Sequence, residues 1–354
     1  PVHCGMTVHS VVGCSHRCTY CYVPDMGVSY SEARPYGLKG EEIVYALVKN
    51  PYFLPGTLGT YIALGSLGEP FHPLGVEKTL EYISVFYKYL GNPVQFSTKA
   101  YLNESTISRL SHFKEVSPLI TIITLNKYKI LEPNAPDPYK RLEVIRGLRK
   151  RGLAPVLFLR PLIPGLIEDA LEVMKEAKRY GAVGVVVGGM RVTPAILARL
   201  ESVGLDTLAI RKRIRGNLRN GVQVNVQLSD LKNELVREAR RIGLTPFLSA
   251  CCANTYAIYL ARRQRIPCAG LDYVDGKFCT DCPVHCKDIK TVVDEAEVKS
   301  SLEKILKVKV KEIEVNDHKL IINTDNNKRA RRILSKGYRD IIEVAYRRRI
   351  IIKS

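Results

Sequence analysis

Three cysteines near the start of the chain have the type and spacing of metal ligands. Cys14, Cys18 and Cys21 follow the pattern C-x3-C-x2-C, and Tyr20 stands directly before the last of them. Three thiolates this close in sequence can bind three irons of a [4Fe-4S] cluster and leave the fourth iron open to another ligand. A disulfide pair and a zinc site are the alternatives, and His16 inside the loop could compete as a zinc ligand. The spacing favours the cluster, and an open iron favours an enzyme.

A second group of cysteines lies in the carboxyl-terminal half. Its six members are Cys251, Cys252, Cys268, Cys279, Cys282 and Cys286. The last three have the spacing C-x2-C-x3-C, which is that of the first group in reverse order. The pattern favours a second [4Fe-4S] cluster, whose fourth thiolate would come from Cys251, Cys252 or Cys268. A structural zinc site is the alternative, and a third option is that some of these thiols are free.

Other polar residues are placed where they could bind a ligand. Gly68 and Glu69 lie in a Gly-Ser-Leu-Gly-Glu-Pro turn, where glycine lets the backbone approach a ligand and a carboxylate can accept hydrogen bonds from an ammonium group. Lys99 and Arg160 each end an apolar run, so they could contact an anionic ligand. The alternative is that both are solvated strand ends or members of internal ion pairs.

The elements that must position these residues are alternating strands and helices. Apolar runs predict strands at 8–12, 60–65, 94–98, 120–124, 155–160 and 184–188. Amphipathic stretches predict helices at 40–49, 76–90, 104–113, 138–151, 168–180 and 194–201. Six β-α units predict an α/β fold with parallel strands, arranged as a partial (β/α)6 barrel whose active site lies at the carboxyl ends of the strands. Cys14 follows the first predicted strand, at that end.

The chain is predicted to divide into three regions. Residues 1–203 form the partial barrel, residues 204–289 a basic helical region with the second cysteine group, and residues 290–354 a small basic α+β module. In the second region, a last strand at 246–250 would bring Cys251 and Cys252 to the barrel mouth, and 253–289 is predicted as loop.

The composition limits the partners and the compartment. The net charge of +19 over 354 residues suits a polyanion such as RNA or DNA, and a basic surface without such a partner is the alternative. No apolar run reaches the ~18 residues of a membrane helix, and no signal peptide is recognised, so we expect no membrane partner. Ten cysteines in such a chain favour metal or redox chemistry in the cytoplasm.

The first cysteine loop and the Gly68-Glu69 pair resemble those of the radical S-adenosylmethionine (AdoMet; radical SAM) enzymes. The resemblance implies that the open iron binds AdoMet and that Gly68 and Glu69 hold its amino group. It also implies that one electron from a ferredoxin- or flavodoxin-like donor cleaves AdoMet to a 5′-deoxyadenosyl radical.

Within that superfamily, residues 8–190 resemble the spore photoproduct lyase-like branch. The shared motifs are Cys18–Tyr22, Pro70–Pro73 with Glu77, Ser97–Lys99, Glu132–Pro136 with Arg141 and Leu142, and Pro161–Leu166. We expect AdoMet contacts from Tyr20, Ser97, Lys99 and Arg160, and the resemblance implies a hydrogen-atom donor at Cys251 or Cys252. The usual Thr-Asp after Gly-Ser is replaced by Leu67-Gly68-Glu69, so a substrate role of that Asp is not carried over.

The sequence therefore predicts a radical SAM enzyme that abstracts a hydrogen atom from nucleic acid, in RNA modification or DNA repair. One alternative is radical chemistry on a protein, peptide or metabolite, including sulfur insertion. Another is an Fe–S or zinc protein that binds nucleic acid without catalysis.

Overall fold

A seven-stranded open sheet forms the centre of the computed structural model, which describes residues 5–268, 280, 282–289 and 292–353. In spatial order its strands are β1 (Met6–Val8), β4 (Ile62–Leu64), β5 (Val94–Thr98), β6 (Ser117–Thr121), β7 (Val156–Leu159), β8 (Gly184–Val187) and β11 (Thr245–Phe247). All neighbouring strands are parallel. The predicted α/β class and parallel sheet are confirmed, and β11 is the last strand, which was predicted at 246–250 and lies at Thr245–Phe247.

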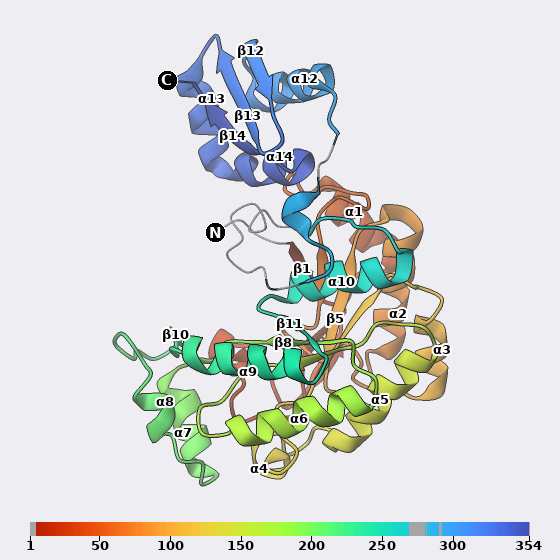
Figure 1. Ribbon diagram of the computed structural model, residues 1–354, viewed down its shortest axis with the longest axis vertical. Coiled ribbons are helices and arrows are strands. Elements are labelled where there is room, and N and C mark those ends of the chain that lie inside the picture. Colours follow the sequence, from red (N-terminus) through yellow and green to blue (C-terminus); the bar gives the residue numbers. More distant parts are fainter. Residues whose placement is uncertain (1–4, 269–279, 281, 290–291, 354) are drawn as a thin grey trace.

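Helices cover the outer face of this sheet (Figure 1). They are α1 (Gly40–Lys49), α2 (Val76–Val85), α3 (Glu104–Leu110), α5 (Pro138–Lys150), α6 (Ile167–Arg179) and α9 (Ser229–Arg241). Every second strand residue on this side of the sheet, such as Leu157 and Val185, packs against the buried faces of the helices, and together they form one large hydrophobic core. The strands are apolar almost throughout because both faces of a parallel sheet are covered.

Helix α10 (Ala250–Arg262) covers part of the other face of the sheet. Its residue Ala253 packs with Val156, Val186 and Phe247. These strand residues alternate with those that face the outer helices. Gln95 donates a hydrogen bond from Nε2 to the Ala250 carbonyl at 3.0 Å, near the start of β5. The prediction that residues 253–289 are loop is therefore wrong for 253–262, which form a helix packed against the sheet.

Shorter elements build the rim at the carboxyl ends of the strands. They are β2 (Val11–Gly13), β3 (Ala33–Pro35), α4 (Tyr128–Leu131), β9 (Arg191–Val192), α7 (Pro194–Ser202), α8 (Leu208–Arg211) and β10 (Val224–Asn225), together with the 3-10 turn Val23–Met26. The single strand predicted at 8–12 is two strands: β1 in the central sheet and β2 paired with β3.

The carboxyl-terminal residues form a small module with its own core. Its elements are α12 (Glu295–Leu306), β12 (Val310–Val315), β13 (Lys319–Thr324), α13 (Asn327–Ile333), α14 (Arg339–Tyr346) and β14 (Arg349–Ile352). The predicted hairpin is β12–β13, and β14 adds to it in parallel. Leu302, Leu320 and Ile350 are among its fully buried side chains. Of the helices described in the chain, none is both long and apolar enough to cross a membrane.

The module contacts the amino-end side of the central sheet (Figure 1). Tyr52, in the loop that leads into β4, donates a hydrogen bond to the Lys336 carbonyl at 2.9 Å, and its ring lies 5.9 Å from that of Tyr338. Arg347 donates hydrogen bonds to the carbonyls of Leu58 and Cys268. The carboxyl ends of the strands, where the first cysteine loop lies, are therefore left clear of the module.

Candidate active site

The first cysteine loop begins where β2 ends and packs against the turn after β4. Gly13 donates a backbone hydrogen bond to the Leu67 carbonyl at 3.0 Å and forms a parallel bridge with Gly68. Gly13 has φ +83°, and a Cβ on Gly68 would lie 2.5 Å from the Val11 carbonyl oxygen. Both positions therefore need glycine, because the loop and the turn approach each other backbone to backbone.

The segment after α4 holds the loop from another side. The Thr19 amide donates to the Leu131 carbonyl at 2.9 Å, and the Asn134 amide donates to the His16 carbonyl at 3.2 Å. The Tyr20 hydroxyl donates to Glu132, whose other oxygen lies 2.6 Å from Nη1 of Arg141. Glu132 and Arg141 are fully buried, so this ion pair is shielded from solvent.

Opposing effects act on the ionisable groups of this buried network. Burial alone would raise the pKa of Glu132, but the charges of Arg141 and Lys99 outweigh it and lower that pKa. Burial alone would lower the pKa of Lys99, whereas Cys18 and Glu132 raise it. Both groups are therefore charged at neutral pH. The cationic partners keep Glu132 ionised as the acceptor of the Tyr20 hydroxyl.

Arg199 of α7 is a third anchor, which sequence analysis did not find. Its Nε donates to the Thr19 carbonyl at 3.1 Å and its Nη2 to the Cys21 carbonyl at 2.5 Å. The guanidinium also lies 5.9 Å from the centre of the Tyr30 ring. Nothing in the local sequence distinguishes Arg199 from the other arginines of amphipathic helices.

Glu69 joins three parts of the site. It is 5% exposed, and its carboxylate accepts hydrogen bonds from the Thr98 hydroxyl, from the Lys99 amide at 2.9 Å and from the Phe71 amide at 3.1 Å. Nδ1 of His16 lies 3.9 Å from the same carboxylate. A carboxylate accepts about four hydrogen bonds, so Glu69 has little remaining capacity for a ligand.

The three thiols are close enough to affect one another. Burial raises the pKa of Cys14 to about 11, with Glu69 adding to the effect, and raises the pKa of Cys18 to about 12. Burial also raises the pKa of Cys21. Metal binding must therefore displace a proton from each thiol.

The donor set of this loop fits an iron–sulfur cluster in chemistry. It offers three thiols and a half-buried cation, Lys99, that would offset the negative charge of the thiolates. Within the described part of the chain, no three His, Cys, Asp or Glu side chains are arranged to hold a metal ion as they stand. Cluster binding therefore requires the thiols to turn toward a common centre.

The other predicted ligand-binding residues lie at the same end of the sheet. Ser97 is in β5 beside the Gly65 carbonyl, and Lys99 follows β5, 5.6 Å from the centre of the Tyr20 ring. Arg160 follows β7 and stacks its side chain over Gly188, where a Cβ would lie 2.5 Å from Cβ of Arg160. These residues come from neighbouring strand ends, as the predicted topology requires.

Cys251 and Cys252 lie elsewhere, in the first turn of α10. Cys251 packs against Tyr61, which precedes β4, so it is at the amino ends of the strands. The expectation that these thiols point into the barrel mouth is wrong, because the start of α10 lies against the sheet near the starts of β4 and β5.

The other cysteines of the second group gather near α10. The thiol of Cys252 is hydrogen-bonded to Cys251, that of Cys268 to Cys286, and all four influence one another's charge. Cys282 and Cys252 both pack against the hydrophobic cluster that contains Phe247 and Ala253. Cys279 lies outside the described residues, so its predicted part in the site is not described.

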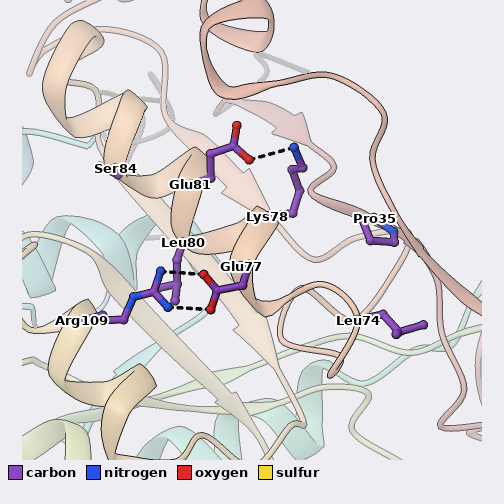
Figure 2. A pocket seen from close by; sticks show the side chains of 8 residues that line it. All are labelled: Pro35, Leu74, Glu77, Lys78, Leu80, Glu81, Ser84 and Arg109. Atoms are coloured by element: carbon purple, nitrogen blue, oxygen red, sulfur yellow. Dashed lines mark hydrogen bonds and ion pairs between the residues drawn. The ribbon is translucent and has the colours of Figure 1, made fainter.

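A pocket elsewhere on the surface, along α2, is a different kind of feature (Figure 2). Arg109 makes two hydrogen bonds to the Glu77 carboxylate, at 2.6 and 2.9 Å, and Lys78 pairs with Glu81 at 2.8 Å. Its charges are neutralised in pairs, in contrast to the cations at the strand ends.

Known proteins share both the sequence signature and the fold. The family model described as the radical SAM superfamily matches residues 8–177. An uncharacterized protein of Acidianus two-tailed virus is 29% identical over 198 residues, which are 50% of this chain and 64% of that protein. One from Methanocaldococcus jannaschii is 25% identical over 185 residues, 49% of this chain and 66% of that protein. The match thus covers just under two thirds of these relatives.

Solved structures of spore photoproduct lyase have a similar fold. A cysteine-to-serine variant superposes with a TM-score of 0.55 and 19% identity, over 68% of this chain and 75% of that one. A variant with bound AdoMet and dinucleoside spore photoproduct gives a TM-score of 0.54, also at 19% identity, over the same shares of both chains. At this identity the likeness shows the fold alone. The family match covers both the cysteine loop and the Gly-Glu turn, so residues 8–177 of this chain carry a radical SAM superfamily domain.

Proposed function

We propose that this chain binds a [4Fe-4S] cluster through Cys14, Cys18 and Cys21 and uses AdoMet to abstract a hydrogen atom from its substrate. The carrying observation is a three-thiol loop held at the carboxyl ends of the strands by the β4 turn, the segment after α4 and Arg199. When bound, the reduced cluster and AdoMet together supply a 5′-deoxyadenosyl radical.

The chain's own residues position these groups. Gly68 allows close backbone approach beside the loop, and Glu69 fixes the end of β5 against His16. The Lys99 ammonium offsets negative charge beside Cys18. Tyr20 is buried and donates its hydroxyl to Glu132, so its part in AdoMet binding would be to hold the loop in place. Ser97 and Arg160 line the same strand ends and are assigned to AdoMet or substrate contacts.

The substrate class we favour is nucleic acid. The net charge of +19 supports it, and the structurally similar lyase variant is described with a dinucleoside photoproduct bound. A basic surface with no nucleic-acid partner remains the competing interpretation, in which the substrate is a protein, peptide or metabolite.

A second metal group at the amino ends of the strands is part of the proposal. Cys251, Cys252, Cys268 and Cys286 place four interacting thiols near one another, and these thiols too would have to turn toward a common centre to hold a metal. Four thiolates suit either a second [4Fe-4S] cluster or zinc. The assignment of Cys251 or Cys252 as hydrogen-atom donor is less favoured, because both lie at the end of the sheet away from the first loop.

The electron donor would be a ferredoxin- or flavodoxin-like protein, and the cytoplasm is the compartment we propose. Clustered thiols that ligate metal persist where disulfide formation is disfavoured.

Anaerobic AdoMet cleavage tests the central proposal. Reconstituted protein with dithionite should convert AdoMet to 5′-deoxyadenosine, and the triple variant Cys14→Ala, Cys18→Ala, Cys21→Ala should lose this activity. Cys282→Ala is the matched control, because it removes a thiol on the α10 side and should leave cleavage intact. Equal activity of the triple variant and the wild type would refute the proposal. If the wild type cleaves AdoMet and the triple variant does not, mass spectrometry of modified nucleosides in co-purified nucleic acid is the next experiment and would identify the substrate.

A further inference from the structure

Three cations lie together at the carboxyl ends of the strands, and within the part of the chain that the structure describes no carboxylate forms an ion pair with them. Arg160 follows β7, Arg191 lies in β9 and Lys232 lies in the first turn of α9. Arg160 and Arg191 are exposed and Lys232 is half-buried. They come from three separate elements, so a run of basic residues in the sequence does not account for the group.

The backbone makes room for these side chains. The Cβ, Cγ and Cδ atoms of Arg160 would lie 2.5, 2.6 and 2.8 Å from a Cβ on Gly188, so the arginine stem occupies the space that any other residue would fill. Nζ of Lys232 would lie 3.6 Å from a Cβ on the next residue, Gly189. The glycine pair after β8 thus brings Arg160 and Lys232 to the same spot.

No carboxylate balances Arg160 or Lys232 among the residues that the structure describes. Burial and the neighbouring Arg160 lower the pKa of Lys232, and burial together with Arg191 lowers the pKa of Arg160. Arg191 donates to the Asn225 side chain, which is neutral. Other arginines are paired, such as Arg213 with Asp230 at 2.7 Å and Arg211 with Glu201 at 2.7 Å.

Cations that repel one another in a partly desolvated place are unfavourable unless an anionic ligand offsets them. The group also adjoins the first cysteine loop. Arg160 lies close enough to Tyr22, the residue after Cys21, for the two side chains to interact electrostatically. The Tyr22 hydroxyl donates to the Ser66 carbonyl at 2.6 Å, which fixes the ring between the loop and the β4 turn.

We propose that Arg160, Arg191 and Lys232 form a subsite for a phosphate group of the substrate, next to the cysteine loop. This rests on the proposed function, since the subsite would hold the substrate where the hydrogen atom is removed. Two arginine forks and one ammonium suit the oxygens of a phosphate, and three cations exceed what one carboxylate of AdoMet needs. The phosphate would belong to a nucleic-acid backbone or to a free phosphorylated metabolite.

Binding of a short fluorescent oligonucleotide, as single-stranded DNA and as RNA, tests the subsite. Arg191→Ala and Lys232→Ala should each weaken binding about tenfold. Each should also reduce the slope of log K against log salt by about one. Gly188→Ala should weaken binding comparably by displacing Arg160. Gly37→Ala, which adds a methyl group in open space, and Arg109→Ala, which removes an equal charge, are the matched controls.

Competition separates the two sources of phosphate. If a nucleoside monophosphate or pyrophosphate binds in a Lys232-dependent way and neither oligonucleotide does, the subsite stands and serves a metabolite. If none of these probes binds, or if the Arg191, Lys232 and Gly188 variants bind them like the wild type, the subsite is refuted.

AdoMet cleavage without substrate distinguishes this failure from failure of the proposed function. The Arg191→Ala and Lys232→Ala variants should cleave AdoMet at the wild-type rate. Loss of AdoMet binding in these variants would assign the cations to the cofactor and overturn the phosphate subsite. Absence of AdoMet cleavage in the wild type would instead overturn the proposed function.

Discussion

The two ends of the central sheet both gather cysteines, but they do so in different ways. At the carboxyl ends, Cys14, Cys18 and Cys21 come from one short loop, and side chains of later elements hold that loop through its backbone and Tyr20. At the amino ends, the thiols come from α10 and from segments after it, and Arg347 of the terminal module donates a hydrogen bond to the Cys268 carbonyl at 2.8 Å.

The difference suggests different roles. A short loop with external anchors can keep three ligands in place while a fourth position stays accessible, as a catalytic cluster requires. Thiols drawn from several segments, beside the contact between the sheet and a second folded module, are placed to fasten those parts together. Each prediction below acts on one end and follows the effect on the other.

The largest effect is expected from breaking the buried anchor at the carboxyl end. Glu132→Ala leaves Arg141 buried without its carboxylate, which should cost about 3–5 kcal/mol in the free energy of unfolding. The loop should then retain less iron, since Tyr20 also loses its acceptor. Anaerobic denaturant unfolding and iron analysis measure both effects.

A double variant separates charge from packing in that prediction. Glu132→Leu with Arg141→Met removes both charges and should recover most of the stability, because a buried pair contributes little net free energy against apolar replacements. Iron retention should stay reduced, since Tyr20 still lacks a partner. A single Glu132→Ala variant as stable as the wild type would show that the pair does not anchor the loop.

A smaller effect is expected at the amino end. Cys268→Ala and Cys286→Ala should each remove the second metal group while AdoMet is still cleaved, because the first loop lies at the other end of the sheet. Metal analysis decides its nature: iron and sulfide near two clusters support an auxiliary cluster, and one cluster plus one zinc supports a structural site.

Ser249→Ala is a control beside the same thiols, because its hydroxyl lies 2.9 Å from the Cys251 sulfur without being a metal ligand of choice. It should keep the second metal. If the wild type carries only the metal of the first loop, the amino-end thiols are not a metal site and their comparison with the carboxyl end no longer holds.

The sheet and its outer helices could be predicted from the sequence because their periodicity is strong. The strand at 94–98 and the helix at 40–49 are found with the predicted bounds. The strand predicted at 120–124 lies at Ser117–Thr121. Its first residues, Ser117 and Pro118, are not typical strand formers, and the apolar residues after Thr121 belong to a buried loop.

Helix α10 was missed for a physical reason. It is buried along much of its length, and its mixture of alanine, cysteine and polar residues lacks the charged face that marks a surface helix. Because this helix was missed, Cys251 and Cys252 were wrongly expected at the barrel mouth. Arg191, Arg199 and Lys232 could not be predicted as site residues, because only the fold brings them to the loop.

The basic residues of the terminal module provide the last and smallest contrast. Arg347 and Arg348 are 3% and 5% exposed and are used internally, and Arg349 pairs with Glu343 at 3.1 Å. By contrast, Lys328, Arg329 and Arg332 of α13 are exposed. If the module touches nucleic acid, the exposed set should carry the contact, although the run at 347–349 is denser in the sequence.

Replacing Lys328, Arg329 and Arg332 by alanine should therefore reduce the salt slope of oligonucleotide binding by up to about three, with little change in stability. Arg347→Met should do the reverse: it removes the hydrogen bonds to Leu58 and Cys268, so the thermal midpoint should fall while the salt slope stays the same. Titration at several salt concentrations and thermal unfolding of both variants make the measurement. If the α13 variant binds with the wild-type slope, the module is a structural attachment at the amino end and the nucleic acid is held at the carboxyl-end cations alone.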